Sequence, residues 1–92
     1  MPEQRTIERA RDDKREGKSP SAQAGEFVRE AFHHMGRGKR GARSARQAIA
    51  IGLSQARRVG VKLPPPEKGV ASADVRRRAR RDYLKGQTSG VI

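Results

Sequence analysis

Cysteine and tryptophan are absent from the 92 residues of the chain, and only two Phe and one Tyr are present. The absence of cysteine excludes disulfides and thiolate metal sites, and it is compatible with the cytosol. Because only 33% of the residues are hydrophobic, the chain can support one small core, and its composition leans toward partial disorder.

Long apolar runs are also missing from the sequence. No segment approaches the roughly 20 apolar residues that a membrane-spanning helix needs, and the N-terminus lacks the apolar middle region of a secretory signal. We therefore expect a cytoplasmic protein without a membrane partner.

Acidic residues are missing from one long stretch of the chain, residues 37–62. The formal net charge of the whole chain is +12, and this stretch carries eight basic residues without one Asp or Glu: Arg37, Lys39, Arg40, Arg43, Arg46, Arg57, Arg58 and Lys62. Clustered positive charge is typical of nucleic-acid binding, because each neutralised phosphate releases condensed counterions.

Glycine and proline divide the chain into segments that all read as helices. None of the segments alternates apolar and polar residues over four positions, and β-branched or aromatic runs are lacking. The sequence therefore predicts an all-α protein. We expect a charged helix-prone arm, a helical hairpin core, a Pro-rich linker, a basic helix and a flexible tail, over residues 1–18, 19–62, 63–71, 72–86 and 87–92 respectively.

The predicted hairpin core consists of helices at about residues 20–36 and 44–59. Ser19 and Pro20 form a start signal for the first helix, in which Phe27 and Phe32 fall on the apolar face and are expected to anchor the core. A core of fewer than 45 residues rarely stands alone. Either the flanking segments complete it or a second copy does, and we favour a homodimer.

The second helix of the hairpin has clear boundaries and two different faces. Ser44 and Gln47 have the spacing of a capping box, and Gly60 is a C-terminal stop. Gly52 lies on the apolar face, where it indicates a close helix crossing. The opposite face is basic, with Arg43, Arg46, Gln47, Arg57 and Arg58.

The two flanking segments offer little to bury. The first provides only Ile7 and Ala10, so its helix is marginal in isolation. The last is dominated by Arg76, Arg77, Arg78, Arg80 and Arg81, and we expect it to gain order when it meets phosphate. The three prolines between residues 64 and 66 form a stiff spacer that should hold this last segment away from the hairpin.

The stretch from Gly41 to Arg57, with Lys14 to Pro20 upstream, resembles short basic bacterial proteins that carry an RSxxQAIAIGLSxAR motif. The resemblance covers about residues 14–69. That family is of unknown function and is sometimes labelled DNA-binding, so the resemblance implies a bacterial origin and no catalytic mechanism.

Enzymatic and metal sites are not predicted. The loop GRGKRG lacks the spacing of a phosphate-binding P-loop, and no catalytic triad or pair of carboxylates is evident. Only Glu30 and His34 have metal-like spacing, which is too few ligands for a closed site. We therefore expect no catalytic residues, no metal and no cofactor.

The function predicted from the sequence is non-specific binding of duplex DNA, as in a nucleoid-associated or accessory protein. Aromatic residues are too scarce for single-strand stacking, and Arg46 and Gln47 lie near a helix start from which base edges could be read. The predicted contacts are the eight basic residues of 37–62, Gln47 and the five arginines of the last helix. Two alternatives stay open: binding of structured RNA or the ribosome, and a protein-interaction module that docks through the apolar hairpin.

Overall fold

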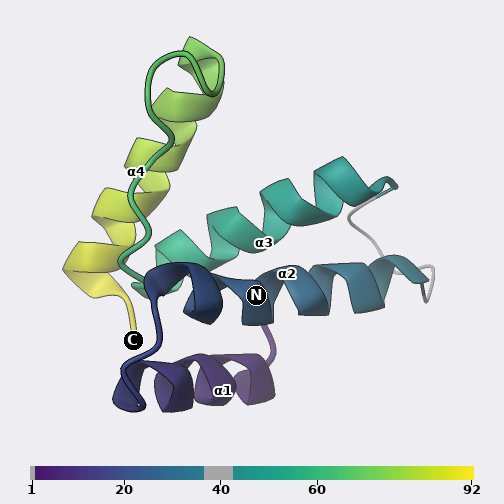
Figure 1. The fold of residues 1–92 in the computed structure, drawn as a ribbon, viewed down its shortest axis with the longest axis vertical. Coiled ribbons are helices and arrows are strands. Elements are labelled where there is room, and N and C mark those ends of the chain that lie inside the picture. The colour runs from purple at the N-terminus through teal and green to yellow at the C-terminus, as the bar shows by residue number, and fades with distance from the viewer. Residues whose placement is uncertain (1, 37–42) are drawn as a thin grey trace.

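Four helices form in the part of the chain that the structure describes, residues 2–36 and 43–92 (Figure 1). In this computed structural model their bounds are α1 (Gln4–Arg15), α2 (Pro20–Gly36), α3 (Ala45–Val59) and α4 (Ala73–Ser89). These described residues include no strand, and only an isolated bridge joins Lys68 to Ala71. The all-α prediction is confirmed, and the helices pack in chain order, α1 on α2, α2 on α3 and α3 on α4. None of the described helices is long and apolar enough to cross a membrane.

The helix starts follow the capping residues in the sequence. The hydroxyl oxygens of Ser19, Ser44 and Ser72 accept hydrogen bonds from backbone amides three residues later, at 3.1, 3.2 and 3.3 Å respectively. Each bond satisfies an amide that has no partner inside its own helix. At the other end of α3, Gly60 adopts a left-handed conformation with φ of 110°, as the stop signal predicts.

The crossing of α2 and α3 is as close as Gly52 indicates. A Cβ atom added to Gly52 would lie 2.5 Å from the Cα of Val28, so no larger residue fits without movement of a backbone. The small residues Ala31 and Ala48 are buried in an apolar cluster that the same two helices share. The predicted close crossing is therefore confirmed.

The core is completed by segments that flank the hairpin. Phe27 is fully buried, and Ile7 and Ala10 of α1 belong to the same cluster, as does Val61 just after α3. The flanking segments thus supply within one chain the apolar surface that the hairpin lacks. Phe32, in contrast, is 37% exposed, so the prediction that both phenylalanines anchor the core is wrong for Phe32.

Helix α1 is held by polar contacts as well as by apolar ones. The buried carboxylate of Glu30 on α2 accepts hydrogen bonds from the backbone amide of Glu3, at 2.8 Å, and from the hydroxyl of Thr6, at 2.6 Å. The side chain of Glu3 in turn pairs with His34, at 2.8 Å. Since an unpaired buried carboxylate is costly, these bonds position α1 along α2.

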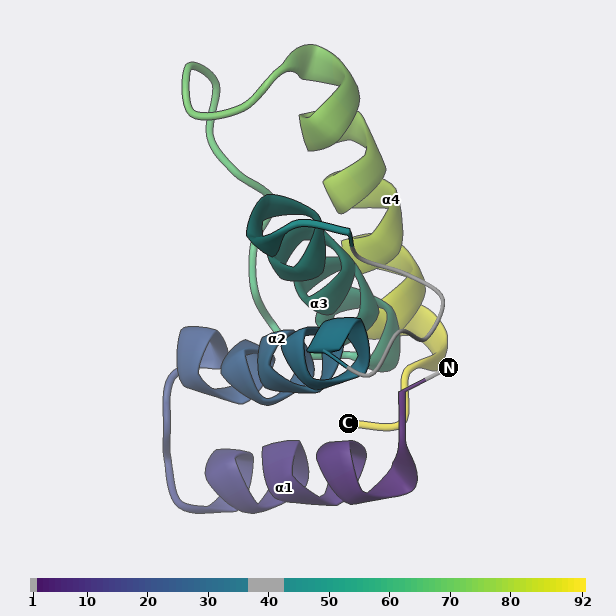
Figure 2. The ribbon, with the colours of Figure 1, turned by 90° about the vertical axis from the view of Figure 1, so that its right-hand side faces the viewer.

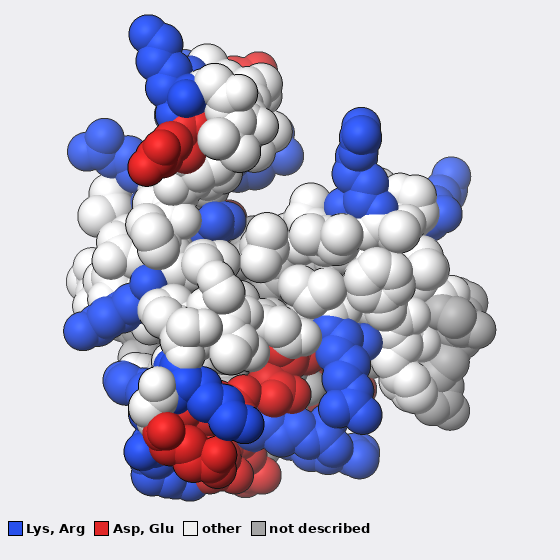
Figure 3. Space-filling view, in the orientation of Figure 1, with Lys and Arg blue, Asp and Glu red and all other residues white. Residues whose placement is uncertain are grey.

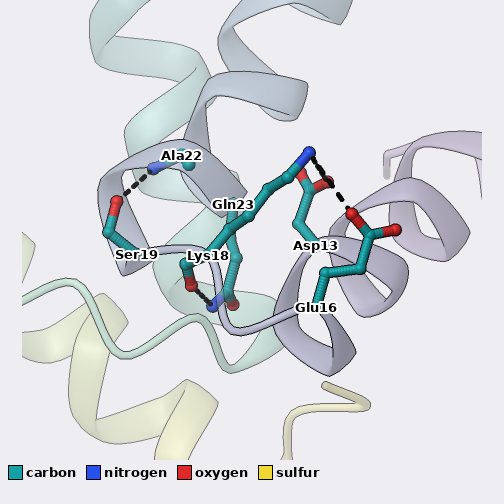
Figure 4. A network of polar contacts seen from close by, with 6 residues as sticks. All are labelled: Asp13, Glu16, Lys18, Ser19, Ala22 and Gln23. Atoms are coloured by element: carbon teal, nitrogen blue, oxygen red, sulfur yellow. Dashed lines mark hydrogen bonds and ion pairs between the residues drawn. The ribbon is translucent and has the colours of Figure 1, made fainter.

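The turn between α1 and α2 is fixed by a polar network (Figure 4). The ammonium of Lys18 lies 3.4 Å from the carboxylate of Asp13 and 3.6 Å from that of Glu16, and both acids raise the pKa of Lys18, Asp13 more strongly. The backbone carbonyl of Lys18 accepts a hydrogen bond from the side chain of Gln23, at 3.0 Å. On the facing side of α2, burial and the nearby carboxyl of Asp13 raise the pKa of Glu26.

Helix α4 packs against α3 instead of being held away by the proline spacer, so that part of the sequence prediction is wrong (Figures 1 and 2). The contact lies at the C-terminal end of both helices. A Cβ atom at Gly86 would overlap the backbone carbonyl of Arg57, and one at Gly90 would come within 2.5 Å of that of Val59. Glycine at these two positions lets the two backbones touch.

The last residues of the chain also contact α1 and α3. Helix α4 continues to Ser89, where a flexible tail from residue 87 had been expected. The amide of Ile92 donates a hydrogen bond to the carbonyl of Val59, at 2.9 Å, and the guanidinium of Arg11 donates to the carbonyl of Val91, at 2.8 Å. Because the side chain of Ile92 packs against the core cluster, the C-terminus joins α1 to α3.

Candidate nucleic-acid interface

Helix α4 carries five exposed basic side chains, more than any other helix of the described ranges. Ala79 and Gly86 are the buried residues of this helix, and they mark the side that packs. At 100° per residue, the basic residues of α4 that point to the opposite side or to its flanks, all of them exposed, are Arg77, Arg78, Arg80, Arg81 and Lys85. We call these five residues the α4 basic face.

Few of these charges are used inside the molecule. Arg77 forms an ion pair with Asp74 at 2.6 Å, and both side chains are largely exposed, so the pair contributes little to stability. The side chains of the other four residues form no hydrogen bond or ion pair with any other residue of the described ranges. The α4 basic face is therefore available to an outside anion.

Arg76 differs from its neighbours because it lies on the packed side of the helix. Its side chain is half-buried, and its Nε atom is buried without a hydrogen-bond partner among the described residues. Part of this side chain therefore packs against the protein, and we do not include it in the α4 basic face.

The N-terminal end of α3 carries a second, smaller group of exposed basic residues, Arg43 and Arg46. The side chain of Gln47, which was predicted to read base edges, is engaged in a hydrogen bond at the start of α3. Its side-chain oxygen accepts a hydrogen bond from the backbone amide of Arg43 at 2.7 Å, while its backbone amide donates to the hydroxyl oxygen of Ser44. Gln47 thus caps the helix start through the amide of Arg43 instead of that of Ser44, and this bond uses the acceptor atom that base reading would need.

Arg57 does not lie on an exposed basic face, and the prediction that placed it there is wrong. Its side chain is buried, and its guanidinium donates hydrogen bonds to the backbone carbonyls of Leu63 and Pro64, both at 3.1 Å. Burial lowers the pKa of Arg57, while the nearby carboxylate of Asp82 opposes that shift. Arg57 therefore fixes the path of the chain from α3 into the linker.

A signal for this role of Arg57 was present in the sequence. Proline has no N–H group, so the run from Pro64 to Pro66 cannot take part as a donor in a regular hydrogen-bonded structure. The carbonyls beside such a run need donors from elsewhere when they are not exposed to water. An arginine in the last turn of the preceding helix, with its five N–H groups, is a suitable donor.

Arg58 and Lys62 remain exposed near the junction of α3 and α4. The guanidinium of Arg58 lies 3.9 Å from the carboxylate of Asp82, which also accepts a 2.7 Å hydrogen bond from Ser54. Asp82 therefore connects α4 to α3, and Arg58 is partly engaged in that connection.

Three of the predicted contact residues, Arg37, Lys39 and Arg40, lie outside the described residues. Within the ranges 2–36 and 43–92, no group of three or more His, Cys, Asp or Glu side chains could hold a metal ion. The residues that the sequence singled out for metal-like spacing are engaged with α1, since Glu30 bonds to Thr6 and His34 to Glu3.

These features define a small all-α protein with a basic helix face exposed to solvent. The chain belongs to DUF6496, a family of unknown function, whose model matches residues 20–68. The match includes α2, α3 and the linker as far as Lys68, and it ends before α4. No curated protein and no solved structure matches the chain. The resemblance noted in the sequence is thereby confirmed as membership of a family of unknown function, whereas the DNA-binding label stays a prediction.

Proposed function

We propose that the protein binds nucleic acid, duplex DNA in the first place, without sequence preference and through the α4 basic face. The observation that carries the proposal is that four of its five basic side chains have no partner within the described residues. Like charges gathered on one helix face repel one another, and a polyanion relieves that repulsion while its counterions are released. In a bacterial cell this activity fits a nucleoid-associated or accessory protein.

The distribution of apolar side chains supports a polyanion over a protein partner. A docking module needs a continuous exposed apolar surface. Part of the hairpin's apolar face is instead buried inside the molecule, with Phe27 against α1 and Gly52 against Val28, while Phe32 and Ile49 are 37% and 44% exposed. The exposed surface over α4 combines the basic face with the separate apolar side chains of Val75 and Leu84, and it contains no exposed aromatic residue, since Tyr83 is half-buried. This favours backbone contact with a duplex over base stacking with a single strand.

The test is a salt titration of binding to two duplexes of unrelated sequence and to one structured RNA. If all five residues of the α4 basic face contact phosphates, the logarithm of the binding constant should fall with the logarithm of salt concentration with a slope of about −4.5. Equal affinity for both duplexes is expected. A clear preference for the RNA would replace duplex DNA by RNA as the ligand, and weak binding that salt does not affect would contradict the proposal.

A charge-matched pair of variants locates the interface. Arg80→Ala/Arg81→Ala removes two charges from the α4 basic face, and Arg5→Ala/Lys14→Ala removes two exposed charges from α1. Alanine preserves the helices in both cases. The α4 variant should reduce the slope to about −2.7, because each phosphate contact contributes about 0.9, and the α1 variant should leave it unchanged. Equal effects of the two variants would mean that only the total charge matters.

A further inference from the structure

Besides the exposed basic residues that α1 carries among its acidic residues, two groups of exposed basic residues lie at different places on the molecule. One is the α4 basic face, and the other is the pair Arg43 and Arg46 at the N-terminal end of α3. The ten residues from Gln47 to Ala56 between Arg46 and Arg57 carry no charge. At 1.5 Å per residue, these ten residues place the pair about 15 Å along α3 from Arg57, where α4 meets α3.

The arrangement of α3 and α4 increases this separation. The two helices meet near their C-terminal ends, where Gly86 touches Arg57 and Asp82 bonds to Ser54, and they diverge toward their N-terminal ends (Figures 1 and 2). Because the α4 basic face lies opposite to Gly86, it points away from α3. In Figure 3, basic side chains stand out from the α4 side and from the N-terminal end of α3, with uncharged surface between them.

One duplex cannot easily contact both groups. The described molecule measures 32 × 32 × 21 Å, which is far below the persistence length of DNA of about 500 Å, so a duplex on the α4 basic face stays nearly straight. Such a duplex runs along the outer side of α4 and leaves Arg43 and Arg46 uncovered. A second polyanion segment is then free to approach this pair.

We infer that one molecule of the protein binds two duplex segments, the first with the α4 basic face and the second with Arg43 and Arg46, and so bridges them. The inference rests on the proposed function. The two sites should differ in strength, because two phosphate contacts give a salt slope of only about −1.8, whereas five contacts give about −4.5. Bridging is therefore strongest where the first duplex already raises the local concentration of the second.

The experiment measures capture of a second duplex. A duplex attached to beads is loaded with the full-length protein, and a labelled free duplex is added at about 50 mM salt. Three proteins are compared: the wild type, Arg43→Ala/Arg46→Ala, and the charge-matched control Arg5→Ala/Lys14→Ala. Circular dichroism and thermal unfolding establish that each variant is folded, and binding of the protein to a single labelled duplex is measured in parallel.

The Arg43→Ala/Arg46→Ala variant should keep the single-duplex affinity within about twofold and the same salt slope, but capture of the second duplex should fall at least tenfold. The α1 control should retain both activities. Two results would overturn the inference and leave the proposed function intact: single-duplex binding by the wild type without any capture, or undiminished capture by the Arg43→Ala/Arg46→Ala variant. The latter would mean that the α4 basic faces of two associated copies form the bridge. No single-duplex binding at all would overturn the proposed function itself.

Discussion

Two glycines of the hairpin, Gly25 and Gly52, lie in helices but in different surroundings. A Cβ atom at Gly25 would meet nothing within 4 Å, whereas one at Gly52 would lie 2.5 Å from the Cα of Val28. Glycine inside a helix costs about 1 kcal/mol relative to alanine. At Gly25 no packing contact compensates for that cost. At Gly52, in contrast, α2 and α3 can cross this closely only because the residue has no side chain.

We therefore expect opposite effects from the same substitution at these two positions. Gly25→Ala should raise the free energy of unfolding by about 0.5 to 1 kcal/mol, and Gly52→Ala should lower it by about 1 to 3 kcal/mol because the two backbones must separate. Urea denaturation of both variants measures the difference. If Gly52→Ala were as stabilising as Gly25→Ala, the helices would not cross as closely as the structure has them.

The roles of some single residues could be predicted from the sequence, and the role of Arg57 could not. The capping roles of Ser44 and Gln47 and the close approach at Gly52 follow from local rules, because each depends on residues within one or two helical turns or on the absence of a side chain. The burial of Arg57 depends on carbonyls six and seven residues later, in a linker whose path a helical projection does not contain. A projection places Arg57 with Arg43 and Arg46 on one face, and only the tertiary structure separates them.

At the level of the elements, the sequence predicted the four helices better than it predicted their packing. Helix α1 was expected to be a marginal arm because only Ile7 and Ala10 are apolar. A search for apolar faces does not detect docking through Thr6 and Glu30, which are polar and buried together. The glycines of α4 were likewise interpreted as punctuation, although Gly86 is the residue that brings this helix against α3.

The linker between α3 and α4 gives a prediction at the same level. Arg57→Met keeps the length of the side chain but removes both hydrogen bonds to the carbonyls of Leu63 and Pro64. Since the carbonyls then lack their donors, the free energy of unfolding should fall by about 2 to 3 kcal/mol. Amide hydrogens in residues 61–72 should exchange faster in this variant, because the linker loses its attachment to α3.

Arg58→Met is the matched control for this experiment. Arg58 is the neighbouring residue on α3, but it is exposed and lies 3.9 Å from its acidic partner Asp82. A long ion pair with its cation exposed to solvent contributes at most about 1 kcal/mol. Equal losses of stability in the two variants, with unchanged exchange in the linker, would contradict the role of Arg57.

For the molecule as a whole, the dominant property is its formal net charge of +12 within dimensions of 32 × 32 × 21 Å. At about 10 mM salt the Debye length is about 30 Å, so nearly all of these charges repel one another, and at about 100 mM it falls to about 10 Å. Repulsion between like charges destabilises the compact state. Salt should therefore stabilise the free protein, and its melting temperature should rise between 10 and 200 mM.

A saturating duplex should reverse this dependence. A ligand present at about 100 times its dissociation constant stabilises the folded protein by about 2.7 kcal/mol. Because salt weakens phosphate contacts, this contribution should be largest at 10 mM and should shrink toward 200 mM, where the melting curves with and without duplex converge. In Arg80→Ala/Arg81→Ala the two curves should converge at lower salt. A bound duplex must make the stability of the protein depend on salt in the opposite sense. Melting temperatures that rise with salt in parallel, with and without duplex, would therefore show that the positive charges do not bind the duplex.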